Sequence, residues 1–460
     1  MSDRIRQADL HSIEGVGRTR LYAAVNSDTA TISQATAPLI MACQGAILVV
    51  FSLVYILVLS PMAFRLTVLL VAIGVSVHFR NRKQLMGELQ RASEAENTFF
   101  EGLTHLLDGF KEVKLNTRRS DDLYAHLRDT AQQVATLKTA TGQRYADYFI
   151  FTQVVFYVLL GTMVFVLPAV SEVYSEQVTR IAAAILFIIG PLTLTISLIP
   201  VLRAANHAVT NITALEAELE AAGELARQKE GGLAQAPETF NTIQARDLVF
   251  IYRDRSGDAS FTLGPIDLAI HSNETLLIVG GNGSGKSTML KLLTALYYPT
   301  SGTITLDGID IRTLGYRAYR ELFAAIYSDY HLFDRLYGLP NIDDSRVISL
   351  LQLMQLEKKT RWRDGRFENQ ELSTGQKKRL ALVISLLEDK QIYVFDEWAA
   401  DQDPSFRQFF YETLLPDLKA RGKTLIVATH DDRYFSVGDR VIKMELGRIV
   451  SDTRPDKSAS

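Results

Sequence analysis

Apolar residues are concentrated in four blocks before Arg203, and the rest of the chain alternates apolar and polar positions as soluble domains do. The first block, Pro38 to Ser60, runs for 23 residues without a charged side chain. At about 1.5 Å per residue, a helix of this length crosses a hydrocarbon layer of about 30 Å. We therefore predict membrane spans over 38–60, 62–79, 148–170 and 181–202. Four buried core helices of a soluble protein are the alternative.

A charged, helix-favouring stretch covers 80–147 between the second and third blocks. It is too long for one ordinary globular helix, so we expect two long helices that meet near 116–122. Arg80, Arg82, Lys83 and Arg203 flank one set of span ends, whereas the turns near Pro61 and 172–177 carry no Lys or Arg. Basic residues favour the cytoplasmic side. This predicts a multi-pass membrane protein whose long loop and both termini are cytoplasmic.

The chain divides into a helical membrane domain over 1–220, a polar linker over 221–241, an α/β nucleotide-binding domain over 242–452 and a tail over 453–460. The expected fold class is therefore an all-α membrane domain followed by an α/β P-loop domain. The net charge of −3 gives no argument for nucleic acid as a partner. Cys43 is the chain's only cysteine, which excludes an intrachain disulfide and a cysteine-based metal cluster.

A glycine-rich loop, GGNGSGKST at 280–288, follows the apolar run at 275–279 and precedes a helix-like segment. Glycines let the backbone wrap phosphate oxygens, and the next helix points its N-terminal amides at the anion. Lys286 is expected to reach the β and γ phosphates, and the Ser287 hydroxyl to ligate Mg²⁺. The other expected phosphate-loop residues are Gly280, Asn282, Gly283, Ser284, Gly285 and Thr288. A Gly/Ser-rich turn without a ligand is the alternative.

Two acids end the apolar run at 392–395. Asp396 is expected to hold Mg²⁺, and Glu397 to polarise the attacking water or act as its base. Solvated carboxylates at a strand end are the alternative.

Three further places carry candidate residues. Ser373, Gly375 and Gln376 open a helix whose N-terminus suits a γ-phosphate, although a plain N-cap is an equal alternative. His430 follows an apolar strand and is a candidate to contact the γ-phosphate or the water, where a structural histidine is the alternative. Tyr252 is a candidate to stack on adenine, and an ordinary strand tyrosine is the alternative.

The segments GGNGSGKST, LSTGQ and YVFDE and the strand-end histidine, in that order, resemble the ATP-binding cassette (ABC) domain. The resemblance implies ATP and Mg²⁺ as cofactors and ATP hydrolysis coupled to transport. It implies a homodimer in which Ser373 and Gly375 of one chain close over ATP held by Lys286 of the other, with Asp403 at the same interface. Apolar helices ahead of the cassette resemble an exporter half-transporter of a bacterial inner membrane, embedded in the lipid bilayer.

The segments at 394–404, 328–334 and 430–435 are similar to the cyclic peptide and siderophore exporters, the branch of pyoverdine, syringomycin and microcin. This implies a peptide or siderophore precursor as cargo. Alternatives are a truncated or regulatory chain that binds ATP without transport, and a lipid flippase. Two departures stand out: Ser328-Asp329 occupies the place of the family's usual Gln, where Asp329 is a possible substitute, and four spans are expected where the family has six. The resemblance thus implies that the chain lacks the family's first two membrane helices.

Overall fold

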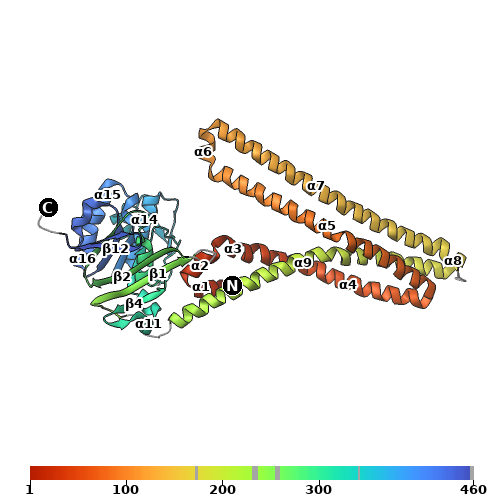
Figure 1. Cartoon of the computed structure of the whole chain (residues 1–460), viewed down its shortest axis with the longest axis horizontal. Helices are drawn as coiled ribbons and strands as arrows, with labels where there is room; N and C mark the ends of the chain where they lie inside the picture. The colour runs from red at the N-terminus through yellow and green to blue at the C-terminus, as the bar shows by residue number, and fades with distance from the viewer. Residues whose placement is uncertain (171–174, 231–236, 254–258, 340–341, 456–460) are drawn as a thin grey trace. The chain divides into compact units, whose positions relative to one another are not determined.

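The structure is a computed structural model that describes residues 1–170, 175–230, 237–253, 259–339 and 342–455. At some positions inside helices it describes the backbone alone. The chain divides into two compact units, one formed by Asn26–Asn211 and the other by Met1–Val25 together with Ile212–Ser460. Figure 1 shows that the first is helical and that the second contains the sheets.

The helical unit is built from a few very long helices. Its elements are η1 (Ala23–Asp28), α4 (Thr29–Leu59), α5 (Pro61–Asp108), α6 (Phe110–Leu115), α7 (Thr117–Gly161), η2 (Thr162–Val166), α8 (Leu167–Val170) and α9 (Ser175–Glu230) as far as Asn211. The turn between α4 and α5 is short because Ser60 caps α5 by accepting from the Ala63 amide, while Pro61 takes the first helical position. Helices α5 and α7 run side by side and are joined through α6 (Figure 1). The two long helices therefore meet at 109–116, on the N-terminal side of the predicted 116–122.

Apolar side chains on the helical unit face both inward and outward. Ile56, Met163 and Ile185 belong to an interior cluster, but Phe51 and Val58 on α4 are 71% and 79% exposed. An apolar surface of this kind is stable against lipid tails and unfavourable in water. By length and composition, two described helical stretches qualify to cross a membrane, Arg20–Leu59 and Gln153–Val170.

The remaining two predicted spans are less completely described. Pro61–Ile73 is a shorter apolar stretch that overlaps the predicted span 62–79, and several side chains beyond it lie outside the description. The predicted span 181–202 lies within α9, where side chains at 193–197 and 199–200 are also not described. The four-span count therefore stays a prediction.

Two sheets form the frame of the second unit. The four-stranded antiparallel sheet has the order β2-β1-β4-β5, and the six-stranded sheet has the order β12-β11-β3-β10-β9-β6. In the larger sheet β11, β3, β10, β9 and β6 are parallel and β12 pairs antiparallel at the edge. The strand bounds are β1 Thr242–Arg253, β2 Ala259–His271, β3 Thr275–Val279, β4 Ser301–Leu306, β5 Ile309–Asp310, β6 Phe323–Ile326, β9 Ile392–Asp396, β10 Thr424–Thr429, β11 Arg440–Glu445 and β12 Arg448–Thr453. A small hairpin, β7 Trp362–Arg363 with β8 Arg366–Phe367, lies apart from both sheets.

The central strands are buried on both faces, as parallel strands covered by other layers are. On β3, Leu276 and Ile278 join the core shared with the antiparallel sheet and α10 (Lys286–Leu293). Leu277 and Val279 point to the opposite core, which α13, α14, α15 and α16 cover. These helices span α13 Asp344–Leu353, α14 Thr374–Glu388, α15 Pro404–Phe409 and α16 Leu415–Ala420, and short α11 (Ile311–Leu314) and α12 (Tyr316–Arg320) complete the unit. Because β3, β9 and β10 are parallel, their carboxyl ends lie at one edge of the sheet, where the site lies.

The start of the chain packs against the end of α9 within this unit. Short helices α1 (Ser2–Gln7), α2 (Leu10–Val16) and α3 (Arg18–Tyr22) place Val16 with Leu215 and Leu219 of α9 in one apolar cluster. Ion pairs reinforce it, among them Arg20 with Glu218 at 2.8 Å.

The linker predicted over 221–241 differs from the structure. Helix α9 continues to Glu230, because Ala, Glu, Leu, Arg and Lys dominate 221–230 and are strong helix formers. Ala222 and Ala226 are also buried there. Residues 231–236 of the predicted linker and 456–460 of the predicted tail lie outside the described residues.

Candidate nucleotide-binding and catalytic site

The phosphate loop, Gly280–Thr288, lies between buried strand β3 and helix α10. Gly280 has a φ of 154°, and a Cβ atom there would come within 2.3 Å of the Met444 carbonyl oxygen. Only glycine fits this close approach of two backbones. The loop therefore packs directly against the β11 backbone and leads into the start of α10, where anions are favoured.

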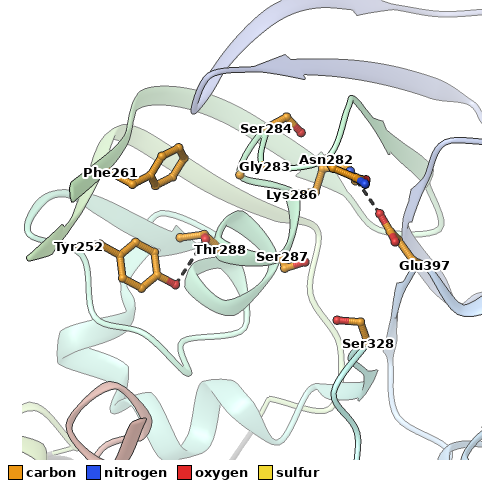
Figure 2. A pocket seen from close by; sticks show the side chains of 11 residues that line it. Tyr252, Phe261, Asn282, Gly283, Ser284, Lys286, Ser287, Thr288, Ser328 and Glu397 are labelled. Atoms are coloured by element: carbon orange, nitrogen blue, oxygen red, sulfur yellow. Dashed lines mark hydrogen bonds and ion pairs between the residues drawn. The ribbon is translucent and has the colours of Figure 1, made fainter. Parts of the chain in front are cut away.

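A cavity of about 490 Å³ opens beside this loop. Figure 2 shows Tyr252 and Phe261 on one side of the loop and Glu397 and Ser328 on the other. The lining is made by Tyr252, Phe261, Asn282, Gly283, Ser284, Gly285, Lys286, Ser287, Thr288, Ser328 and Glu397. The structure thus brings seven loop residues, the aromatic candidate and the candidate base around one cavity large enough for a nucleotide.

Lys286 is 5% exposed and is held by the backbone of its own loop. Its Nζ donates to the carbonyl oxygens of Gly280 at 3.0 Å and Gly281 at 3.2 Å. It also lies 3.3 Å from Oε1 of Glu397 (Figure 2). The ammonium group is therefore fixed at the mouth of the anion site, where it can exchange these partners for phosphate oxygens.

Asp396 ends β9 and is 1% exposed. Neither carboxylate oxygen has a partner in hydrogen-bond geometry among the described residues. Burial raises the pKa of this carboxyl, and the nearby Ser287 hydroxyl and Ser328 amide oppose that rise only in part. A buried carboxylate without a partner is unfavourable unless a cation compensates it. Asp396 and the Ser287 hydroxyl are oxygen ligands of the kind that Mg²⁺ takes together with phosphates and waters.

Glu397 follows Asp396 in an unusual backbone conformation, with φ at 50°. Its amide donates to the Ala428 carbonyl of β10 at 3.1 Å. Glu397 and His430 line a second, small cavity of about 10 Å³, together with Ala399 and Thr429 among others. A cavity of that size suits about one water molecule. The structure therefore places the candidate base and the strand-end histidine around one water-sized space.

Tyr252 lies in the strand β1, and its ring forms part of an aromatic cluster. Its hydroxyl is 3.4 Å from Thr288 Oγ1 and donates to the Tyr297 hydroxyl at 3.2 Å. Tyr297 in turn donates to the Glu14 carboxylate of α2. The Tyr252 ring therefore has a fixed place at the cavity edge, as a stacking surface for a base requires.

Ser373 caps helix α14 with the reciprocal arrangement of a capping box. The Gln376 amide donates to Ser373 Oγ at 3.4 Å, and the Ser373 amide donates to Gln376 Oε1 at 3.1 Å. Ser373 is therefore the N-cap of α14 in the single chain. A Cβ atom on Gly375 would lie 2.7 Å from the Asp401 carbonyl oxygen, so this glycine permits close packing of α14 on the segment after Glu397.

Asp403 caps α15 by accepting from the Phe406 amide at 2.9 Å. The Ser405 hydroxyl, followed by that amide and by Arg379, lowers the pKa of Asp403 to about 2. Ser373, Gly375, Gln376 and Asp403 are absent from the lining of the 490 Å³ cavity formed by described residues. Their predicted roles at a nucleotide therefore stay predictions.

One cavity residue was missed by sequence reasoning. Phe261 pairs directly with Tyr252 across the β1–β2 ladder, so it stands beside the expected adenine position. The register of that hairpin is the signal that points to it. Ser328, in the segment at the place of the family's Gln, lines the cavity, whereas Asp329, the expected substitute, is not among the described residues that line it.

Comparisons with known proteins agree with this geometry. The ABC transporter family model matches residues 263–400. The chain is 36% identical over 423 residues to the ATP-binding protein SyrD of Pseudomonas syringae pv. syringae, covering 88% of this chain and 73% of the relative. It is 30% identical over 217 residues to the probable syringafactin export ATP-binding/permease protein SyfD of Pseudomonas syringae pv. tomato, covering 43% of this chain and 32% of that protein.

A solved structure is similar along nearly the whole chain. It is a bacterial Atm1-family ABC exporter with ATP bound, with a TM-score of 0.76 and 17% identity, covering 98% of this chain and 81% of that one. At this identity the likeness shows the fold, which is that of an ABC exporter.

Proposed function

Because the chain belongs to the ABC transporter family, whose exporters couple ATP hydrolysis to transport, we propose that it moves a cyclic or modified peptide, or a siderophore precursor, out of the bacterial cytoplasm as a homodimer. The observation that carries the proposal is the convergence of Lys286, Ser287 and Glu397 on one cavity beside the unpartnered Asp396 carboxylate. The same chain carries a helical unit with outward-facing apolar side chains. The name of SyfD, a probable syringafactin exporter, supports a cargo of that kind.

In this mechanism the phosphate loop binds ATP, and Lys286 exchanges its contact with Glu397 for contacts with the β and γ phosphates. Asp396 and Ser287 would hold Mg²⁺, which would neutralise charge on the phosphates when bound. Tyr252 and Phe261 border the space for the base. The released Glu397 then orients a water molecule or takes its proton, with His430 on the other side of the small cavity.

The second copy of the chain completes each site. Ser373 caps a 15-residue helix whose N-terminal amides favour a phosphate. We place Ser373 and Gly375 of one copy over ATP bound at Lys286 of the other, with Asp403 at the same interface. Closure of two such sites turns the membrane helices outward, and hydrolysis resets them.

Transport into sealed inside-out vesicles tests the proposal. The purified chain is reconstituted in lipid, and uptake of a cyclic lipopeptide, a siderophore precursor and a labelled lipid is measured with ATP and Mg²⁺ outside. ATP-dependent uptake of the peptide or the siderophore precursor by wild type, and not by the Glu397→Gln variant, is the expected result. Lipid movement alone would favour a flippase, and ATP binding without movement of any cargo would favour a regulatory chain.

A further inference from the structure

A lysine is buried beside the catalytic segment, on helix α14. Lys378 is 4% exposed, although lysine is almost never fully buried unless it is paired. Its Nζ donates to the Glu397 carbonyl oxygen at 2.8 Å and lies 2.8 Å from Oδ2 of Asp401. The two contacts neutralise and solvate the ammonium group, and one of them is to the backbone of the candidate base.

The conformation of Glu397 needs such support. Its φ of 50° lies in the left-handed region, which is unfavourable for a residue with a side chain. The surrounding contacts must therefore hold it there. The amide of Glu397 is fixed by the Ala428 carbonyl, and its carbonyl is fixed by Lys378. Together these two bonds set the direction in which the Glu397 side chain leaves the backbone.

The lysine is itself held by the segment that it supports. The indole Nε1 of Trp398 donates to the Lys378 carbonyl at 2.9 Å, and Trp398 is stacked on Phe410 with ring centres 4.5 Å apart. The next residue, Arg379, donates to Gln402 Oε1 at 2.8 Å. The first turns of α14 and the segment 397–403 therefore form one tightly bonded assembly.

We propose that Lys378 is a positioning residue for hydrolysis: it holds the backbone turn that aims the Glu397 carboxylate at the attacking water. The inference rests on the proposed function, because it assigns Lys378 a part in the same reaction. Lys378, which holds the Glu397 backbone, lies on helix α14, whose N-cap is Ser373. In the proposed homodimer that helix meets the nucleotide held by the partner, so one rigid element joins the two sites.

The test compares Lys378→Met with Lys377→Met in the full-length chain. Methionine keeps an unbranched apolar stem but removes the donor, and Lys377 is the exposed neighbour on the same helix. Misplacement of a catalytic group by about 1 Å costs on the order of 100-fold in rate. We expect kcat for ATP hydrolysis to fall by about 100-fold in Lys378→Met, with KM for ATP within about twofold of wild type. Lys377→Met should keep the wild-type kcat.

Two further variants separate positioning from plain stability. Lys378→Arg keeps a charged donor and should retain a kcat about tenfold above that of Lys378→Met. Asp401→Asn removes the ion pair but leaves the ammonium-to-carbonyl bond in place, so it too should stay above Lys378→Met. If Lys378→Met does not fold, Asp401→Asn at this half-exposed position is compared with wild type instead, and a kcat about 100-fold below wild type would overturn the inference.

The inference is overturned if Lys378→Met keeps kcat within about threefold while Glu397→Gln abolishes hydrolysis. That pair of results would leave the proposed function intact. It is also overturned if Asp401→Asn loses as much activity as Lys378→Met, because the ion pair rather than the carbonyl contact would then carry the effect. Loss of ATP binding in wild type itself would instead count against the proposed function.

Discussion

The ammonium group of Lys286 lies 3.3 Å from Oε1 of Glu397, so the phosphate-binding cation and the candidate base are partners in the nucleotide-free chain. ATP must separate the two groups to bind, because its phosphates take both the ammonium group of Lys286 and the space in front of it. The contact therefore keeps Glu397 away from water activation until a triphosphate takes its place.

Replacing Glu397 with Gln removes a charge that competes for Lys286 and repels the phosphates. We expect the Kd for ATP to fall by up to about fivefold, the effect of a partly exposed ion pair of about 1 kcal/mol. We expect kcat to fall by 100-fold or more, because general-base catalysis is lost. Titration calorimetry and phosphate release measure the two effects. Hydrolysis at the wild-type rate would remove Glu397 from its role.

Tyr252 and Phe261 are expected to contribute to binding of the base. Stacking on an aromatic ring is worth about 1–3 kcal/mol per base, so Tyr252→Ala should raise the Kd for ATP by about tenfold or more. Phe261→Ala should act in the same direction. Tyr252→Phe keeps the ring and serves as the matched control. Binding of inorganic triphosphate should be unchanged in all three, and an equal loss for triphosphate and ATP would show that these rings do not contact the base.

Asp396→Asn should stabilise the nucleotide-free chain and destroy its Mg²⁺-dependent hydrolysis. Burial raises the folded-state pKa of Asp396 above its ordinary 3.8. The neutral carboxyl therefore favours folding below pH 3.8, and that contribution is lost as pH rises through the raised pKa. At pH 7 asparagine avoids the buried charge, so Tm without Mg²⁺ should rise by about 2–4 °C for each kcal/mol relieved. A lower Tm would mean that the carboxylate is compensated within the protein.

The predicted topology places the start of α5 on the outer side of the membrane and the start of α7 in the cytoplasm. A reagent outside the cell should therefore reach the first position and not the second. Cys43 is the only native cysteine, so Cys43→Ser gives a background in which single cysteines can be placed. A membrane-impermeant maleimide should label Arg65→Cys in intact cells and Arg118→Cys only after lysis, since both positions are exposed. Labelling in the reverse order would invert the proposed orientation.

Features confined to a short stretch of sequence were predicted well. The phosphate loop, the strand ending in Asp396 and Glu397, and the Ser60–Pro61 turn each depend on local backbone geometry. The start of the cassette at Thr242 follows from the onset of strand alternation.

Features that depend on partners distant in sequence were not predicted. Phe261 reaches the cavity through the register of a hairpin, and Lys378 is buried although the charges around it suggest an exposed helix face. The end of α9 was missed because an Ala- and Glu-rich sequence is compatible with either a linker or a helix. Burial of Ala222 and Ala226 favours the helix in this last part of α9.

Trp398 is 1% exposed, adjoins Glu397 in sequence and is bonded to Lys378, whereas Trp362, the chain's other tryptophan, lies in the β7–β8 hairpin. With Trp362→Phe, ultraviolet emission comes from one indole at the turn that carries the base. The molecule thus contains its own optical reporter, and stopped-flow fluorescence can time the rearrangement around that base without an attached dye.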